Sequence, residues 1–202
     1  TMARADRPAE ARDQLLTAMR LDPRHPSPYY LYGNLMRDLG ERPLALLSYA
    51  TFLQLEFNTP RTREASASLL NSLYAPRNDA PAPAIVTTVE AGVSRGTPML
   101  QLSYYAAAVP VTEDNAVAPP VDENVSMALQ TYLGLAAKVP FDGDEAFISE
   151  LLQPRVSRLA EAGVTEPFAW FVLAVAGMDG GSEWLDAHPD EWTKLEAVLR
   201  SQ

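Results

Sequence analysis

The sequence predicts an all-α protein, and two observations carry this prediction. Apolar residues recur every three or four positions along most of the 202-residue chain, which is the period of one helix face. Several prolines also follow a residue that caps helices well, as in Ser27-Pro28 and Thr59-Pro60, and Pro is favoured in a first helical turn. The most strand-like segment, "IVTTVEAGVS" (85–94), still repeats Ile or Val every four residues, so we expect a helix there as well.

In the N-terminal part the apolar period predicts four helices, at 8–21, 27–39, 42–57 and 60–75. The Pro-rich stretch "APRNDAPAPA" (75–84) follows them and is typical of a linker. We therefore expect one helical unit over residues 1–75 and a C-terminal α-helical domain over 84–202.

The C-terminal part predicts helices at 124–139, 143–163, 166–178 and 182–201, after an irregular acidic loop at 109–124. Pro154 should kink or split the second of these helices, and Pro189 should divide the last. The segment 166–178 is apolar on all sides, which predicts a helix at the centre of the fold.

Composition excludes several classes of function. A hydrophobic fraction of 47% fits a globular chain, and a net charge of −10 disfavours nucleic acid and anionic membrane surfaces as partners. The longest uncharged apolar run, at 167–178, is too short to insert into a membrane. The chain has no Cys, which excludes disulfides, thiolate metal sites and Cys nucleophiles. The compartment stays open: cytoplasmic, or periplasmic and cell-envelope if an N-terminal signal was removed.

A shift of the sequence by 34 residues aligns Ala11 with Ala45, Leu15 with Tyr49 and Ala18 with Phe52. The preceding helix reads Tyr29-x2-Tyr32-Gly33-x2-Met36. Over residues 8–58 this resembles the tetratricopeptide repeat (TPR), whose pattern is W-x2-L-G-x2-Y, then A-x3-F. The resemblance implies antiparallel helix pairs, with a capping helix at 60–75, packed through the repeat positions Tyr29, Tyr32, Gly33, Ala45, Tyr49 and Phe52. Gly33 would allow a close helix approach near Ala45.

The resemblance further implies a non-catalytic scaffold or adaptor that binds another protein, as a peptide or a helix, in a groove lined by first helices. On the 27–39 helix the residues off the packing face are Tyr30, Asn34 and Arg37, and we expect them to bind the partner. Asn34 occupies the place where chaperone-type TPRs hold a terminal carboxylate. Glu64 and Ser68 replace the basic residues that such a clamp needs.

Other functions have weaker support. His25 and His188 lack metal-ligand spacing, so we expect no metal, no cofactor and no catalytic residues, although either imidazole could serve as the base of a cryptic hydrolase. A structural subunit of a larger complex, for example in the cell envelope, is the main alternative. The segment 180–192, with a partly exposed Trp184, is a second candidate edge for a partner. The sequence leaves the oligomeric state open.

Overall fold

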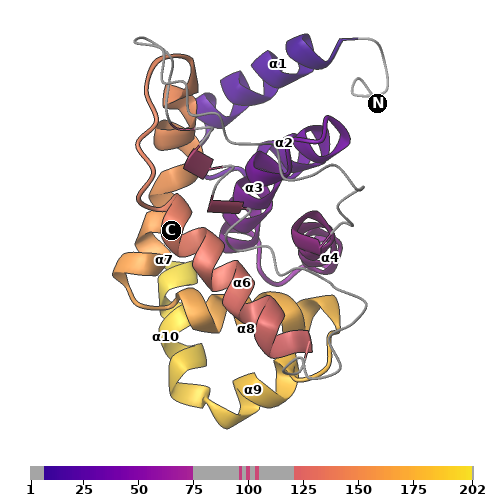
Figure 1. Ribbon diagram of the computed structural model, residues 1–202, viewed down its shortest axis with the longest axis vertical. Coiled ribbons are helices and arrows are strands. Elements are labelled where there is room, and N and C mark those ends of the chain that lie inside the picture. The colour runs from indigo at the N-terminus through magenta and orange to yellow at the C-terminus, as the bar shows by residue number, and fades with distance from the viewer. Residues whose placement is uncertain (1–6, 75–95, 97–98, 101–102, 105–120, 202) are drawn as a thin grey trace.

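The computed structural model describes residues 7–74, 96, 99–100, 103–104 and 121–201, and every regular element in these ranges is a helix (Figure 1). The all-α prediction is therefore confirmed. The expected helix at 85–94 and the expected linker at 75–84 lie outside the described residues. The elements are α1 (Pro8–Leu21), α2 (Pro26–Asp38), α3 (Arg42–Leu55), α4 (Pro60–Tyr74), α6 (Val121–Ala136), a 3-10 turn η2 (Gly143–Glu145), a π-helical turn η3 (Ile148–Leu152), α7 (Gln153–Glu161), α8 (Thr165–Ala176), α9 (Gly181–Ala187) and α10 (Pro189–Arg200).

Two prolines divide helices as predicted. The π-helical turn η3 ends two residues before Pro154, and the Gln153 amide donates to the Ile148 carbonyl five residues back. A proline ring clashes with the carbonyl four residues earlier, and a wider π turn relieves that clash. Pro189 likewise opens α10 immediately after α9.

Several predicted boundaries differ from the structure by one to three residues. Helix α6 begins at Val121, so the last residues of the expected loop at 109–124 are helical. Asp122 and Glu123 lie in its first turn, where the helix dipole favours negative charge. Helix α2 begins at Pro26, one residue before the predicted start at 27, because the Nδ1 of His25 accepts a hydrogen bond from the Ser27 amide at 3.4 Å and caps the helix.

Helix α3 lies at the centre of the N-terminal helices and is buried from Pro43 to Gln54. Its buried Ser and Thr hydroxyls bond within the helix: Ser48 donates to the Leu44 carbonyl at 2.7 Å and Thr51 to the Leu47 carbonyl at 2.8 Å. Helices α2, α4 and α7 all pack against it. Helix α8 is also buried, from Pro167 to Leu173, which agrees with the apolar pattern of its sequence.

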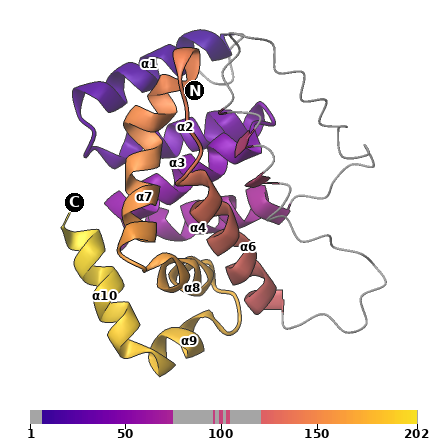
Figure 2. The ribbon, with the colours of Figure 1, turned by 60° about the vertical axis from the view of Figure 1, so that its left-hand side comes forward.

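The hydrophobic core is continuous from α1 to α10. It joins Leu16 in α1 to Leu199 in α10 through the buried faces of the helices between them. Figures 1 and 2 show α1 to α4 at one end of the molecule and α8 to α10 at the other, with α6 and α7 running between. Contacts of α7 with α3, and of α8 with α4, place the C-terminal helices directly on the N-terminal ones.

The six repeat positions, on α2 and α3, are all buried. The close approach predicted at Gly33 is present, but the nearest atoms belong to Tyr49 rather than to Ala45. A Cβ placed on Gly33 would lie 2.8 Å from Cε1 of Tyr49. Tyr49 stands one helical turn beyond Ala45, and its ring is large enough to fill the space that glycine leaves.

Replacing Gly33 by Ala should therefore destabilise the protein, by about 1–3 kcal/mol. The Tyr49 ring is fully buried and its hydroxyl is hydrogen bonded, so it cannot move away at no cost. The free energy of unfolding, measured by urea denaturation, checks this expectation.

Gly134→Ala in α6 is the matched control, since a Cβ there meets no atom within 4 Å. That variant should be neutral or more stable by up to about 1 kcal/mol, from helix propensity alone. Equal effects of the two substitutions would contradict the packing role of Gly33.

Candidate partner-binding surface on helix α2

Helix α2 has a buried side and an accessible side, as the rotation of about 100° per residue requires. The buried side holds Tyr29, Tyr32, Gly33, Leu35 and Met36. The accessible side, which we call the α2 outer face, consists of Tyr30, Leu31, Asn34, Arg37 and Asp38. The three residues predicted to bind a partner therefore lie together.

Tyr30 lies at the edge of the core rather than fully in solvent. Its ring centroid is 5.2 Å from that of Phe52 and 6.2 Å from that of Tyr49, both in tilted arrangements. Partial burial, followed by a hydrogen bond to Glu64 on α4, raises the pKa of Tyr30 above its usual value. The side chain is thus oriented before any partner arrives.

Asn34 is held by the neighbouring helix. Its Oδ1 accepts a hydrogen bond of 2.8 Å from the hydroxyl of Tyr49, which is fully buried. The Asn34 side chain also hydrogen bonds to Tyr30, which opposes the rise in the pKa of that phenol. Asn34 therefore links the packing under Gly33 to the accessible surface.

Arg37 is the cation of the α2 outer face. It donates through Nη1 to the Ser68 hydroxyl at 3.3 Å, and its Nη2 lies 3.2 Å from Oδ1 of Asp38. The side chains of Arg37 and Asp38 are 40% and 60% exposed, and an ion pair this exposed contributes at most about 1 kcal/mol. The ion pair with Asp38 therefore holds Arg37 only weakly.

Helices α2 and α4 meet through residues 34 positions apart. Nη1 of Arg61 donates to the Ser27 hydroxyl at 2.9 Å, and Tyr30 interacts with Glu64. Arg61 is itself fixed by an ion pair with Glu56 and by its place 5.5 Å from the Phe52 ring centroid. The 34-residue shift found in the sequence therefore also relates these residues of α2 to the residues that they contact on α4.

Leu31 is a member of this surface that the sequence reasoning missed. Its side chain is 51% exposed, and it lies about 100° around the helix from Tyr30. The signal was available, since a helical projection places Leu31 next to Asp38, at the border between the polar residues and buried Leu35. An exposed leucine one turn before Asn34 adds an apolar contact to a polar surface.

Both histidines have structural contacts. His25 caps α2. His188 stacks on Trp184 with ring centroids 4.2 Å apart, and its Nδ1 lies 2.8 Å from the Trp184 carbonyl oxygen. Trp184 is half-buried and stacks in turn on Trp170, at 5.5 Å. Among the described residues, no group of three His, Cys, Asp or Glu side chains could hold a metal ion.

Comparison with family models, with curated proteins and with solved structures returned no match for this chain. Within the described ranges, no single helix has the length and hydropathy of a membrane span. The helix pair Ile148–Glu161 and Thr165–Ala176 meets those criteria together but bends by 111°.

Buried tyrosines around the α2–α3 contact should make the protein sensitive to alkali. Burial raises the pKa of Tyr32 and of Tyr49 to about 12. A phenol with a raised pKa in the folded state contributes stability that is complete below the unfolded pKa of about 10 and is lost between about 10 and 12. We expect the free energy of unfolding to fall steeply in that range.

Tyr49→Phe isolates one of these groups. At neutral pH the variant should lose about 1 kcal/mol with the hydrogen bond to Asn34, but its stability should fall less steeply above about pH 10. Urea unfolding over a series of pH values measures both effects. A pH dependence identical to that of the wild type would refute the buried-phenol interpretation.

Proposed function

We propose that this chain is a non-catalytic protein–protein interaction scaffold with a TPR-like N-terminal unit, and that a partner peptide or helix binds across its α2 outer face. One observation carries the proposal: α2 and α4 lie beside each other at the 34-residue offset, through Ser27 with Arg61 and Tyr30 with Glu64. Stacked first helices at a fixed offset form an extended surface suited to binding another chain.

The arrangement of the C-terminal helices supports this location. Helix α7 and the η3 turn pack on α3, which is the second helix of the pair. The outer face of α2 remains accessible, since Leu31 and Arg37 are both exposed. A partner would therefore bind on the side of the N-terminal unit that is formed by α2, the first helix of the pair.

The chemistry of the surface suits a segment with both apolar and acidic side chains. Leu31 and the exposed edge of the Tyr30 ring offer apolar contact, and aromatic residues and arginines contribute strongly to binding energy at interfaces. Arg37 offers guanidinium N–H groups to a carboxylate. Because Tyr30 and Asn34 are already oriented, little side-chain entropy would be lost on binding.

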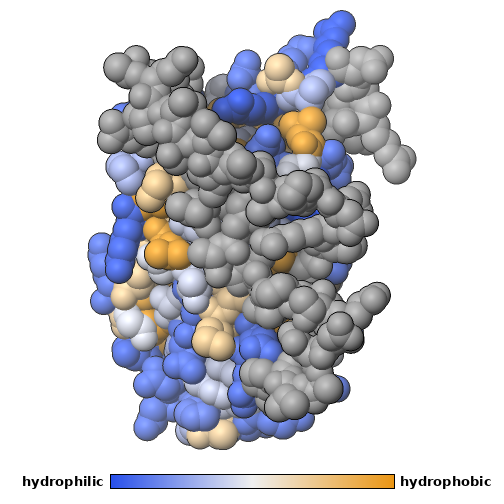
Figure 3. All heavy atoms as spheres, viewed as in Figure 1, coloured by the Kyte–Doolittle hydropathy of each residue, from blue (hydrophilic) through white to orange (hydrophobic). Residues whose placement is uncertain are grey.

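A second candidate, a structural subunit of a larger complex, is favoured by exposed apolar residues elsewhere. Met127 and Leu135 on α6 are 57% and 40% exposed. On the face drawn in Figure 3, however, hydrophobic residues form small separate patches among hydrophilic ones. A broad helix-to-helix interface would need a larger continuous apolar area.

An affinity pull-down that compares two double variants tests the α2 site. Leu31→Ser/Arg37→Ala removes the apolar and cationic contacts of the outer face and leaves the core intact. Leu21→Ser/Arg63→Ala makes the same changes at exposed positions outside it. We expect partners retained by the wild type and by the control to be lost, or weakened at least about tenfold, in the first variant.

Partners retained equally by all three proteins would reject the α2 outer face as the binding site. If the same partners were lost from a Met127→Ser/Leu135→Ser variant instead, the surface of α6 would carry the interaction and the second candidate would be supported.

A further inference from the structure

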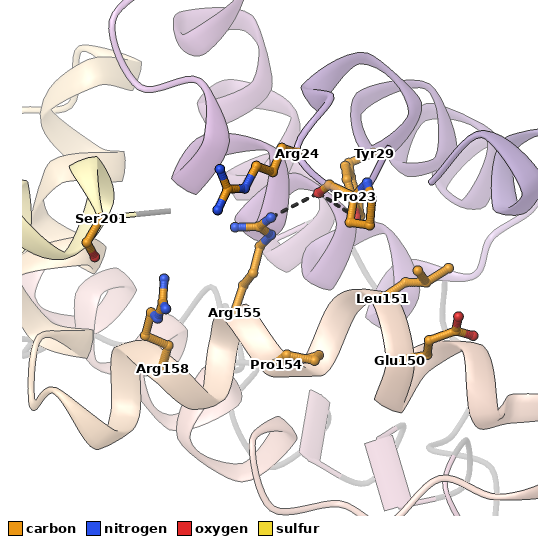
Figure 4. A pocket seen from close by; sticks show the side chains of 9 residues that line it. All are labelled: Pro23, Arg24, Tyr29, Glu150, Leu151, Pro154, Arg155, Arg158 and Ser201. Atoms are coloured by element: carbon orange, nitrogen blue, oxygen red, sulfur yellow. Dashed lines mark hydrogen bonds between the residues drawn. The ribbon is translucent and has the colours of Figure 1, made fainter. Parts of the chain in front are cut away.

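A cleft of about 300 Å³ lies where the turn before α2 meets helix α7, close to the end of α10. Pro23, Arg24 and Tyr29 line it from the N-terminal side, and Leu151, Arg155 and Arg158 from the C-terminal side. Figure 4 shows the three arginine side chains extending into the same space from these two elements. The cleft is separate from the α2 outer face, because Tyr29 stands on the buried side of that helix.

The guanidinium of Arg155 is fixed at the back of the cleft. Its Nη2 donates to the Pro23 carbonyl at 2.9 Å, and the same oxygen accepts the Tyr29 hydroxyl at 3.1 Å. Burial lowers the pKa of Arg155 below its usual value, Tyr29 opposes this change, and the positive charges of Arg158 and Arg24 lower the pKa further. Both of these cations are thus close enough to Arg155 to repel it.

Two acids lie near the cleft, and both have partners of their own. Glu150 on its rim is paired with Arg20 at 3.1 Å, and Asp22 accepts the backbone amide of Arg24. Among the described residues, no salt bridge joins an acid to Arg24 or to Arg158. A cleft lined by cations focuses positive potential and raises the local concentration of anions, even in a chain with a net charge of −10.

The donors fit a phosphate better than a carboxylate. A carboxylate carries one negative charge on two oxygens, whereas a phosphate monoester carries up to two negative charges on three oxygens and can accept from more guanidinium groups at once. Leu151 and Pro154 give the same cleft an apolar side, against which the body of a phosphorylated molecule can pack. The volume of the cleft leaves room for such a body beside the phosphate.

We infer that the cleft formed by Arg24, Arg155 and Arg158 is a binding site for a phosphate monoester group. The group comes either from a small phosphorylated metabolite or from a phosphorylated side chain of a protein. The η3 turn contributes to the site directly, because the widened turn before Pro154 sets where Leu151 and Arg155 stand along the helix. π-helical turns of this kind occur frequently at functional sites.

Isothermal titration calorimetry on the full chain tests this inference, with inorganic phosphate, phenyl phosphate and acetate as probes. Phenyl phosphate should bind most tightly and acetate most weakly. Arg24→Gln/Arg158→Gln should weaken the binding of both phosphates by about tenfold or more, since each charge-assisted hydrogen bond contributes about one order of magnitude. Arg63→Gln, the same change on the exposed surface of α4, should have no effect.

A phosphoserine peptide forms the final arm of the experiment. Binding tighter than that of phenyl phosphate would identify a protein side chain as the source of the phosphate, and weaker binding a small metabolite. Three results would overturn the site: no binding of either phosphate at tens of millimolar, acetate binding as tightly as phosphate, or unchanged affinity in the double arginine variant. Circular dichroism of each variant confirms that loss of binding is not loss of fold.

Discussion

The contact between Gly33 and Tyr49 determines how helix α2 sits in this protein. The absent side chain lets the Tyr49 ring lie against the backbone of α2, where an added Cβ would be only 2.8 Å from Cε1. The same tyrosine then reaches Asn34 with its hydroxyl, at 2.8 Å. One side chain of α3 thus sets both the distance to α2 and the rotation of α2 about its own axis. That rotation decides which residues face outward.

The C-terminal helices extend the effect of this contact to the rest of the chain. Helix α7 packs on α3, whose burial from Pro43 to Gln54 makes it the common support of both halves. Helix α7 also brings Arg155 to the carbonyl of Pro23, 132 residues away in the sequence. Two accessible sites of opposite character therefore depend on α2: a mixed apolar and polar face, and an arginine-lined cleft at the turn before it.

Local patterns predicted the helices and the buried repeat positions well, because apolar period, proline and glycine act over a few residues. They failed where contacts between residues far apart in the sequence determine the structure. The partner of Gly33 is Tyr49 instead of Ala45 because ring volume and helix register, rather than the repeat pattern, select the contact. No pattern in the sequence indicated the cleft, since Arg24 and Arg158 line a common space only after α7 packs against the N-terminal helices. Leu31 could have been found by helical projection.

A double-mutant cycle between positions 33 and 49 tests the central claim most directly. Gly33→Ala and Tyr49→Leu are made alone and together, and the free energies of unfolding are compared. If the tyrosine ring is what excludes a side chain at position 33, Gly33→Ala should cost at least about 1 kcal/mol less in the Tyr49→Leu background. An equal cost in both backgrounds would show that glycine is needed for another reason, and that the Tyr49 ring does not set the position of α2.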